Sequence, residues 1–212
     1  AMSLEELNAK VAEGEVKELP VLIKADVQGS VEALASSLEA IEVNGVKVKV
    51  IHKGVGAITE KDVMMLSSDD AIMIGFNVRP DANVRQIIKN EKINLMLSNI
   101  IYDIIEQIEA SMSGMREIKY KENITGYAKI TDVFKITGTG KVGGCLMTEG
   151  KISRDGKLRL IRDGVVIYDG DIGQLKRFKD DVREVDAGYE CGLNIANYND
   201  VKVGDIIEAY KL

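Results

Sequence analysis

The most constraining feature of this 212-residue chain is a change of pattern near residue 115. Between residues 20 and 97, short apolar runs alternate with segments whose apolar residues recur at helical spacing. After residue 117 no segment has a convincing helical period, and short β-rich runs are separated by Asp-Gly turns. The two patterns belong to different architectures, so the chain is predicted to form two domains with a boundary near residue 115.

The first region is predicted to be an α/β/α module over residues 20–98. Strand–helix alternation implies a mostly parallel sheet with helices on its faces. The expected strands are 20–25, 46–52, 71–75 and 93–97, and the expected helices between them are 29–41, 60–67 and 80–89. Residues 3–13 are expected to form a helix with a Ser3–Glu6 capping box, at the end of a preceding linker over residues 1–19.

A connecting helix is predicted over residues 99–116. Isoleucines follow the 3.6-residue period from residue 100 to residue 108, either Ser98 or Asn99 is expected to cap the helix, and Gly114 is expected to end it. An uncovered apolar stripe would be an aggregation risk or a docking surface. We therefore expect at least the first turns to pack against the α/β/α module.

The second region, residues 117–212, is predicted to be all-β. Many short strands with Gly-containing turns are typical of a small β-barrel or a sandwich. The expected strands are 127–135, 142–148, 157–161, 164–169, 189–195 and 206–211. The sequence as a whole therefore predicts an α/β module followed by a small β-barrel or sandwich.

Composition excludes several classes of protein. Hydrophobic residues make up 45% and charged residues 29%, as in ordinary globular domains, and no apolar run reaches the ~18 residues that a membrane span requires. The two cysteines are 46 positions apart and form no CxxC pair, so free thiols and a cytoplasmic location are expected. With His52 as the only histidine, a His-rich metal site or a Ser-His-Asp triad is disfavoured.

Charge is distributed unevenly between the two regions. Residues 1–116 carry 12 basic and 18 acidic residues, a net charge of −6, whereas residues 117–212 carry 16 of each. The net charge of −6 by itself argues against a nucleic-acid binder, and any basic surface for an anionic partner is expected in the second region, where it would require clustered cations.

The most informative segment is the basic stretch from Lys176 to Lys179. Lys176, Arg177 and Lys179 surround Phe178, and this combination can contact phosphates and stack on an unpaired base. The alternative is a charged hairpin that is partly neutralised by the acidic residues 180, 181 and 184.

Two glycine and cysteine features allow more than one interpretation. Residues 138–143 (GTGKVG) match G-x-G-x-x-G, but a strand rather than a helix is expected to follow, and no Walker A motif is present. This segment is therefore predicted to be a turn.

Cys145 and Cys191 lie in β-like, apolar segments, which favours buried thiols; if both face one cavity, they form a small, soft pocket beside the basic stretch.

A different class of function would use the edge of the α/β sheet. Asp26 and His52 follow or end predicted strands, where small-molecule sites of α/β enzymes lie. Helix capping by Asp26 and a loop position for His52 are the preferred interpretations. A small-molecule enzyme remains the alternative.

Six runs of residues resemble the last third of bacterial translation initiation factor two. They occur in order within residues 20–212: residues 24–33 (KADVQGSVEA), 54–60 (GVGAITE), 75–80 (GFNVRP), 100–103 (IIYD), 162–168 (RDGVVIY) and 175–182 (LKRFKDDV). The resemblance implies an α/β/α module that touches the ribosome, a connecting helix, and a β-barrel similar to domain two of elongation factor Tu. It also implies that the GTPase domain, with its GTP and Mg²⁺, lies upstream and is absent from this chain, so neither enzyme activity nor a cofactor is expected.

The resemblance further implies a role for the barrel in recognising the formyl-methionyl end of initiator tRNA and in placing it on the ribosome during subunit joining. DNA and membranes are not expected partners, and no catalytic or metal-binding residue is expected. The implied contact residues are Cys145, Lys176, Arg177, Phe178, Lys179, Glu190, Cys191 and Gly192. Phe178 stands where some relatives have Tyr, so stacking is retained but a hydroxyl hydrogen bond is not.

A physical basis for selecting the formylated end follows from charge. Formylation converts the α-ammonium of the methionyl ester into a neutral amide, and burying an unpaired ammonium costs far more free energy. A pocket near Cys145, Cys191 and Gly192 is expected to accept the amide, and Gly192 lets the main chain approach it. Glu190 is expected to orient a cation or a ribose hydroxyl.

Overall fold

The computed structural model describes residues 3–6, 18–66, 71–114 and 122–212, which fall into two compact units, Ala1–Lys119 and Tyr120–Leu212. The change of sequence pattern near residue 115 lies close to this division. Within the described ranges, no helix is long and apolar enough to cross a membrane.

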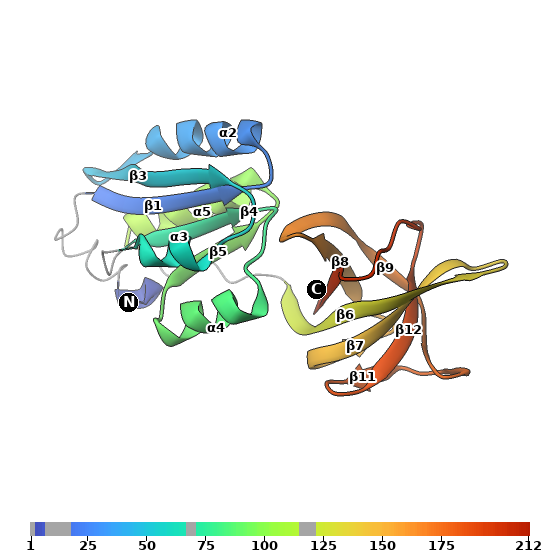
Figure 1. Ribbon diagram of the computed structural model, residues 1–212. Coiled ribbons are helices and arrows are strands. Elements are labelled where there is room, and N and C mark those ends of the chain that lie inside the picture. Colours follow the sequence, from blue (N-terminus) through green and yellow to red (C-terminus); the bar gives the residue numbers. More distant parts are fainter. Residues whose placement is uncertain (1–2, 7–17, 67–70, 115–121) are drawn as a thin grey trace. The chain divides into compact units, whose positions relative to one another are not determined.

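The first unit is built on a five-stranded sheet (Figure 1). Four strands are parallel and the short edge strand β2 is antiparallel to its neighbour, which confirms the expected mostly parallel sheet. In sheet order the strands are β2 (Glu42–Val43), β3 (Val46–Val55), β1 (Glu18–Ala25), β4 (Ile72–Phe76) and β5 (Asn94–Ser98).

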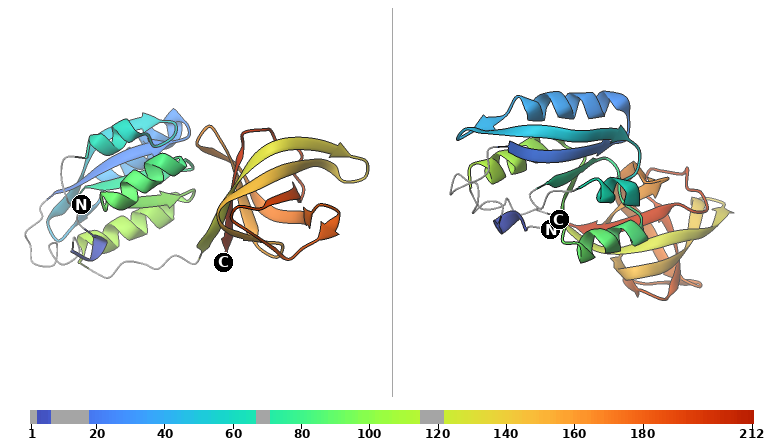
Figure 2. Two further views of the ribbon diagram at one scale, coloured as in Figure 1. Left: turned by 60° about the horizontal axis from the view of Figure 1, so that its bottom comes forward. Right: turned by 60° about the vertical axis from the view of Figure 1, so that its left-hand side comes forward.

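Helices cover both faces of this sheet (Figures 1 and 2). On one face, α2 (Gln28–Glu39) and α5 (Ile101–Met112) share an apolar cluster with the strands. On the other face lie α3 (Glu60–Met64) and α4 (Ala82–Asn90), over strand residues such as Leu22 and Met73, which alternate with the members of the cluster. The layers are therefore α/β/α.

Helix α5 is packed along its whole described length. Ile104, Ile108 and Met112, one from each turn, are fully buried in the cluster. The prediction that the first turns pack against the module is confirmed, and the packing extends to the last turn. The helix is therefore part of the core of the first unit, not a separate spacer on the outside of it.

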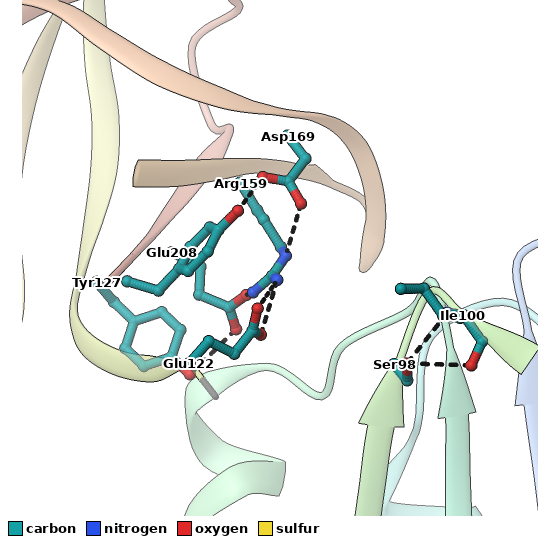
Figure 3. A network of polar contacts seen from close by, with 8 residues as sticks. Ser98, Ile100, Glu122, Tyr127, Arg159, Asp169 and Glu208 are labelled. Carbon is teal, nitrogen blue, oxygen red and sulfur yellow. Dashed lines mark hydrogen bonds and ion pairs between the residues drawn. The ribbon is translucent and has the colours of Figure 1, made fainter. Parts of the chain in front are cut away.

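The predicted cap of this helix is wrong. Neither Ser98 nor Asn99 caps it; the N-cap is Ile100, whose side chain has no hydrogen-bonding group. Ser98 instead accepts a hydrogen bond from the Ile100 N–H at 3.0 Å, before the helix begins (Figure 3). Gly114 lies beyond the C-cap with a φ of +71°, as predicted for a glycine that ends a helix.

Two other helices have side-chain caps at their first turns. The α3 capping box is complete, because Thr59 and Asp62 exchange side-chain and main-chain hydrogen bonds. At the N-terminus, Ser3 accepts a hydrogen bond from the Glu6 N–H at 3.1 Å, as expected for the predicted helix over 3–13. The rest of that prediction, and most of the linker over 1–19, lies outside the described residues.

The second unit is a closed antiparallel barrel of six strands, which confirms the predicted barrel (Figures 1 and 2). The pairing of β8 with β9 joins the two ends of the sheet. Around the barrel the strands are β9 (Val165–Arg177), β12 (Glu190–Ile195), β7 (Gly140–Ser153), β6 (Asn123–Ile136), β13 (Ile206–Lys211) and β8 (Lys157–Arg162). The short strands β10 (Asp180–Asp181) and β11 (Glu184–Asp186) extend β9 and β7.

The G-x-G-x-x-G match is a hairpin turn. It joins β6 to β7, and Gly138 and Gly140 have φ values of +85° and +90°, which only glycine adopts easily. No helix follows, as predicted, so the segment lacks the helix N-terminus that would receive a phosphate.

A buried arginine fastens the start of the barrel (Figure 3). The Arg159 guanidinium donates to Glu122 at 2.7 Å, to Glu208 at 3.1 Å and to Asp169 at 3.2 Å, and it lies 4.0 Å from the centroid of the Tyr210 ring. Burial by itself lowers the pKa of the guanidinium, but the three carboxylates outweigh burial and raise it. The cluster ties Glu122 to β8, β9 and β13 through one side chain.

Candidate functional site

A hollow of about 690 Å³ lies on the outer surface of the barrel, over β6, β7, β9 and β12. Val142, Gly144 and Leu146 of β7 line it, and they alternate with the buried residues Cys145 and Met147. Because successive side chains of a strand point to opposite faces, the hollow lies outside the barrel core.

The floor of the hollow is main chain. Gly144 is directly opposite Gly192, and Gly192 is in turn opposite Lys176, so two glycines lie side by side across adjacent strands. A Cβ at Gly192 would lie 3.6 Å from Val142, an ordinary contact, whereas a Cβ at Gly144 would lie 3.1 Å from the Phe134 ring. Glycine at both positions keeps the floor low and open to a ligand.

Exposed apolar side chains surround this floor. Five of them line the hollow, with exposed fractions from 36% to 92%: Phe134, Ile136, Leu146, Phe178 and Tyr189. Clustered exposed apolar surface beside polar groups marks a binding site in a protein of this kind. Sequence reasoning had found only Phe178. Period-2 alternation indicates that Phe134 and Ile136 lie on the same face of their strand, but it does not indicate that this face is the outer one.

Arg177 lines the hollow and contacts two aromatic rings. Its Nε donates to the main-chain oxygen of Glu190 at 3.1 Å. Its Cζ lies 4.8 Å from the centroid of Tyr189 and 5.5 Å from that of Phe178. The guanidinium is therefore pre-positioned by one hydrogen bond to main chain and two cation–π contacts, and a role for the Glu190 carboxylate stays a prediction.

The other two cations of the basic stretch differ from each other. Lys176 lines the hollow and lies 4.0 Å from Asp181 across the β9–β10 hairpin, in an exposed pair that contributes little to stability. Lys179 is exposed in the hairpin turn after Phe178 and is not among the residues that line the hollow. Every other residue of the expected contact set lines it.

The two cysteines are brought together under the floor. Cys145 is directly opposite Cys191, both thiols are free, and their exposed fractions are only 1% and 6%. The side chains join the apolar core of the barrel, so they support the hollow from below and do not form its outer walls. Cys145 also donates to the Gly143 oxygen at 3.5 Å.

The two thiols have different acidities. Interaction with the Cys145 thiol and the nearby charge of Arg177 lower the pKa of Cys191 against the opposing effect of burial. The interaction with Cys191 and burial raise the pKa of Cys145. Cys191 is therefore the more readily deprotonated of the pair.

The α/β sheet edge does not assemble the alternative enzyme site. Asp26 does not cap α2; it accepts hydrogen bonds from the Val27 N–H at 3.0 Å and from Asn77 Nδ2 at 2.9 Å. His52 lies within β3, opposite Leu22, and not at the strand end. Four residues of parallel strand separate these positions by about 13 Å, too far for an acid–base pair. Among the described residues, no group of three His, Cys, Asp or Glu side chains is placed to hold a metal ion.

Comparisons with known proteins assign translation factor families to both units. Residues 1–109 match the family model of translation-initiation factor 2, and residues 140–208 match that of elongation factor Tu domain 2. Translation initiation factor IF-2 of Geobacillus sp. (strain WCH70) is 54% identical over 209 residues, and that of Bacillus cereus (strain AH187) is 55% identical over 209 residues.

The chain is shorter than these relatives. Each alignment covers 99% of this chain but only 29% of the Geobacillus protein and 30% of the Bacillus cereus protein. A solved structure, GDP-bound aIF5B from Aeropyrum pernix, is 19% identical and covers 92% of this chain and 34% of its own, with a TM-score of 0.35 that adds nothing to the assignment. On the family models and the two bacterial relatives, this chain belongs to the translation initiation factor 2 family.

Proposed function

We propose that the hollow on the barrel binds the formyl-methionyl acceptor end of initiator tRNA, and that the chain thereby helps to place this tRNA on the ribosome during subunit joining. Membership of the initiation factor family supports a role in translation initiation. The observation that carries the rest is the main-chain floor of Gly144 and Gly192, which lies between the cation Arg177 and exposed apolar side chains.

The single-stranded acceptor end has two kinds of group for this surface to bind. Its phosphates interact with Lys176, Arg177 and Lys179, and its unpaired bases stack on the exposed rings of Phe178 and Tyr189. Each stacked base contributes about 1–3 kcal/mol. Because Arg177 already has a main-chain hydrogen bond and contacts both rings, little side-chain entropy is lost on binding.

The aminoacyl group lies over the glycine floor. The methionine side chain contacts the apolar wall that includes Phe134, Ile136 and Leu146. The formylated nitrogen is a neutral amide, whereas a free α-ammonium would lose its hydration and would be repelled by Arg177. Asp132 and Glu190 also line the hollow and would offset part of that repulsion, so desolvation is the larger source of selectivity.

This function requires binding and no catalysis. In the proposed arrangement the chain supplies no catalytic residue, and GTP and Mg²⁺ act in another part of the parent protein, in the cytoplasm. In the same proposal the first unit contacts the ribosome.

Nuclease footprinting on formylated and unformylated initiator tRNA tests the proposal. The double substitution Lys176→Ala with Arg177→Ala should weaken protection of the acceptor end and reduce the salt dependence, since about 0.7 counterions are released per phosphate contact on a single strand. The matched control is Lys157→Ala with Lys211→Ala, which removes the same charge from β8 and β13 on the opposite side of the barrel.

Two results would reject the assignment. Unchanged protection in the Lys176/Arg177 variant, or an equal loss in the control, would remove the hollow as the tRNA site. Equal protection of the formylated and unformylated tRNAs by the unsubstituted chain would remove the account of selectivity by desolvation.

A further inference from the structure

We propose that Cys145 and Cys191 form a dithiol site that a peroxide oxidises to an internal disulfide, and that this modification weakens ligand binding in the hollow above it. The second part rests on the proposed function, whereas the first part is a property of the barrel alone. Proteins of reducing compartments form disulfides mainly as transient, redox-sensing bonds.

The pairing of the strands brings the thiols within reach of a disulfide. Cys145 and Cys191 are directly opposite on the antiparallel strands β7 and β12, and both side chains point into the barrel. Directly opposite residues of an antiparallel pair have Cα atoms about 4.5–5.5 Å apart. Disulfides span Cα separations of about 4.4–6.8 Å, so the bond requires no change of strand register.

The two cysteines have distinct chemical roles. Cys191 is the nucleophile, since it is the more exposed of the two thiols, at 6% against 1%, and the adjacent Cys145 thiol and the charge of Arg177 favour its thiolate. Cys145, which keeps its proton to a higher pH, is the resolving thiol. The adjacency of a low-pKa cysteine and a resolving cysteine is the arrangement found in redox-sensing sites.

Access to the thiols is limited by size. Both cysteines line the hollow, but only 1% of Cys145 and 6% of Cys191 is exposed. Hydrogen peroxide is close to water in size and can reach them, whereas bulky thiol reagents are slowed. The site therefore selects a small oxidant.

The reaction balances with peroxide as the only co-reactant. The Cys191 thiolate attacks one peroxide oxygen, the O–O bond breaks, and after protonation one water leaves while Cys191 becomes a sulfenic acid. The Cys145 sulfur then attacks the Cys191 sulfur, forms the S–S bond and displaces the second water. The two sulfurs lose two electrons in total, and the peroxide gains them.

The consequence reaches the floor of the hollow. The bond brings the two sulfurs to about 2.05 Å, closer than two thiols in contact, and it removes the S–H donor that Cys145 offers to Gly143. Gly144 and Gly192, the next opposite pair along the same strands, form the floor and must shift with them. A dithiol reductant restores the reduced state by thiol–disulfide exchange.

Peptide mass spectrometry tests the chemistry directly, because the chain contains only two cysteines. After treatment with hydrogen peroxide, the peptides that contain residues 145 and 191 should be linked within one chain, with the loss of two hydrogens. Both thiols should become unreactive to N-ethylmaleimide under denaturing conditions, and dithiothreitol should restore both. Sulfenic or sulfinic acid at either cysteine without a cross-link, or a disulfide between two chains, would overturn the proposal, whereas oxygen added at the methionines does not bear on it.

Single substitutions test the order of the steps. In Cys145→Ser, the sulfenic acid at Cys191 has no resolving thiol and should be captured by dimedone. In Cys191→Ser, the remaining Cys145 should resist the same dose of peroxide. Equal oxidation of the two variants would contradict the assigned roles.

The effect on binding separates this proposal from the proposed function. The oxidised chain should protect formyl-methionyl-tRNA at least tenfold less well than the reduced chain, with recovery after dithiothreitol. The control is the Cys145→Ser, Cys191→Ser double variant, whose own protection should be the same before and after peroxide. A reduced chain that gives no protection refutes the tRNA site and leaves the disulfide standing, whereas equal protection by the oxidised and reduced chains refutes regulation alone.

Discussion

Substituting Gly192 by alanine separates the ligand-binding role of the floor from its role in folding. The added Cβ would meet only Val142, at 3.6 Å, and Gly192 does not have a positive φ. The free energy of unfolding should therefore change by no more than about 1 kcal/mol, and the reduced flexibility of the unfolded chain favours the variant. The methyl group nevertheless occupies the position where a ligand would lie against the main chain.

The expected loss of affinity follows from the cost of one extra methyl group in a fitted contact. Overpacking of this kind costs about 1–3 kcal/mol, which corresponds to a roughly 5- to 150-fold weaker complex. Titration of labelled formyl-methionyl-tRNA with the Gly192→Ala variant would measure this loss of affinity, after calorimetry has shown that the variant is folded. Gly29→Ala is the matched control, since a Cβ there meets nothing within 4 Å and lies in the other unit. Unaltered affinity in Gly192→Ala would refute the glycine floor as the ligand contact.

Three further predictions concern stability, each measured by calorimetry of the whole chain. Asp62→Ala leaves the Lys24 ammonium buried without its partner at 3.0 Å, and should destabilise the first unit by about 3–5 kcal/mol. Burial by itself raises the pKa of Asp62, but the hydrogen bond from Thr59 and the charge of Lys24 outweigh burial and lower that pKa. The contribution of Asp62 to the free energy of unfolding should therefore be complete above about pH 4 and decline as the pH falls through the lowered pKa. A stability difference between the unsubstituted chain and Asp62→Ala that does not change with pH would contradict this. Thr59→Ala removes one side of the α3 capping box and should cost about 1 kcal/mol, with an unchanged transition counting against the cap. Arg159→Met removes the cation shared by three carboxylates and should destabilise the barrel by more than about 3 kcal/mol, whereas an equally stable variant would show that their other contacts, such as that of Glu208 with Tyr127, are sufficient.

The spacing of apolar residues along the sequence was sufficient to predict the order of the main secondary-structure elements and whether each is a helix or a strand. Helix and strand periods gave every strand of the first sheet except the short β2, because these periods report which side chains are buried. The N-cap of α5 could not be predicted from these periods. The N-cap is the extended residue just before the helix, and the path of the chain between β5 and α5 makes that residue Ile100 and not Ser98. The closure of the barrel was also beyond the local pattern, because β8 and β9 pair as a consequence of strand tilt around the whole barrel.

The site was predictable to a different extent. The inward direction of Cys191 agrees with its alternation with Glu190 and Gly192, so burial of the thiol was among the interpretations that the sequence allowed. Tyr189 and Phe134 were missed because their exposure depends on which strands lie beside them. Lys179 was grouped with its neighbours by proximity in sequence, but the positive φ of Phe178 begins a turn that takes Lys179 away from the lining of the hollow.

The ion pair between Arg159 and Glu122 affects how the barrel responds to a force applied at the start of its first strand. Glu122 is the first described residue of its unit, and both its carboxylate oxygens accept from one Arg159 nitrogen at 2.7 Å. A pull from upstream therefore loads β8 before it can peel β6 away from β13, whose terminal pair is Asn123 with Lys211. Since β8 is hydrogen-bonded on both sides, to β13 and to β9, the force is shared by three strands and the ladder does not open one bond at a time.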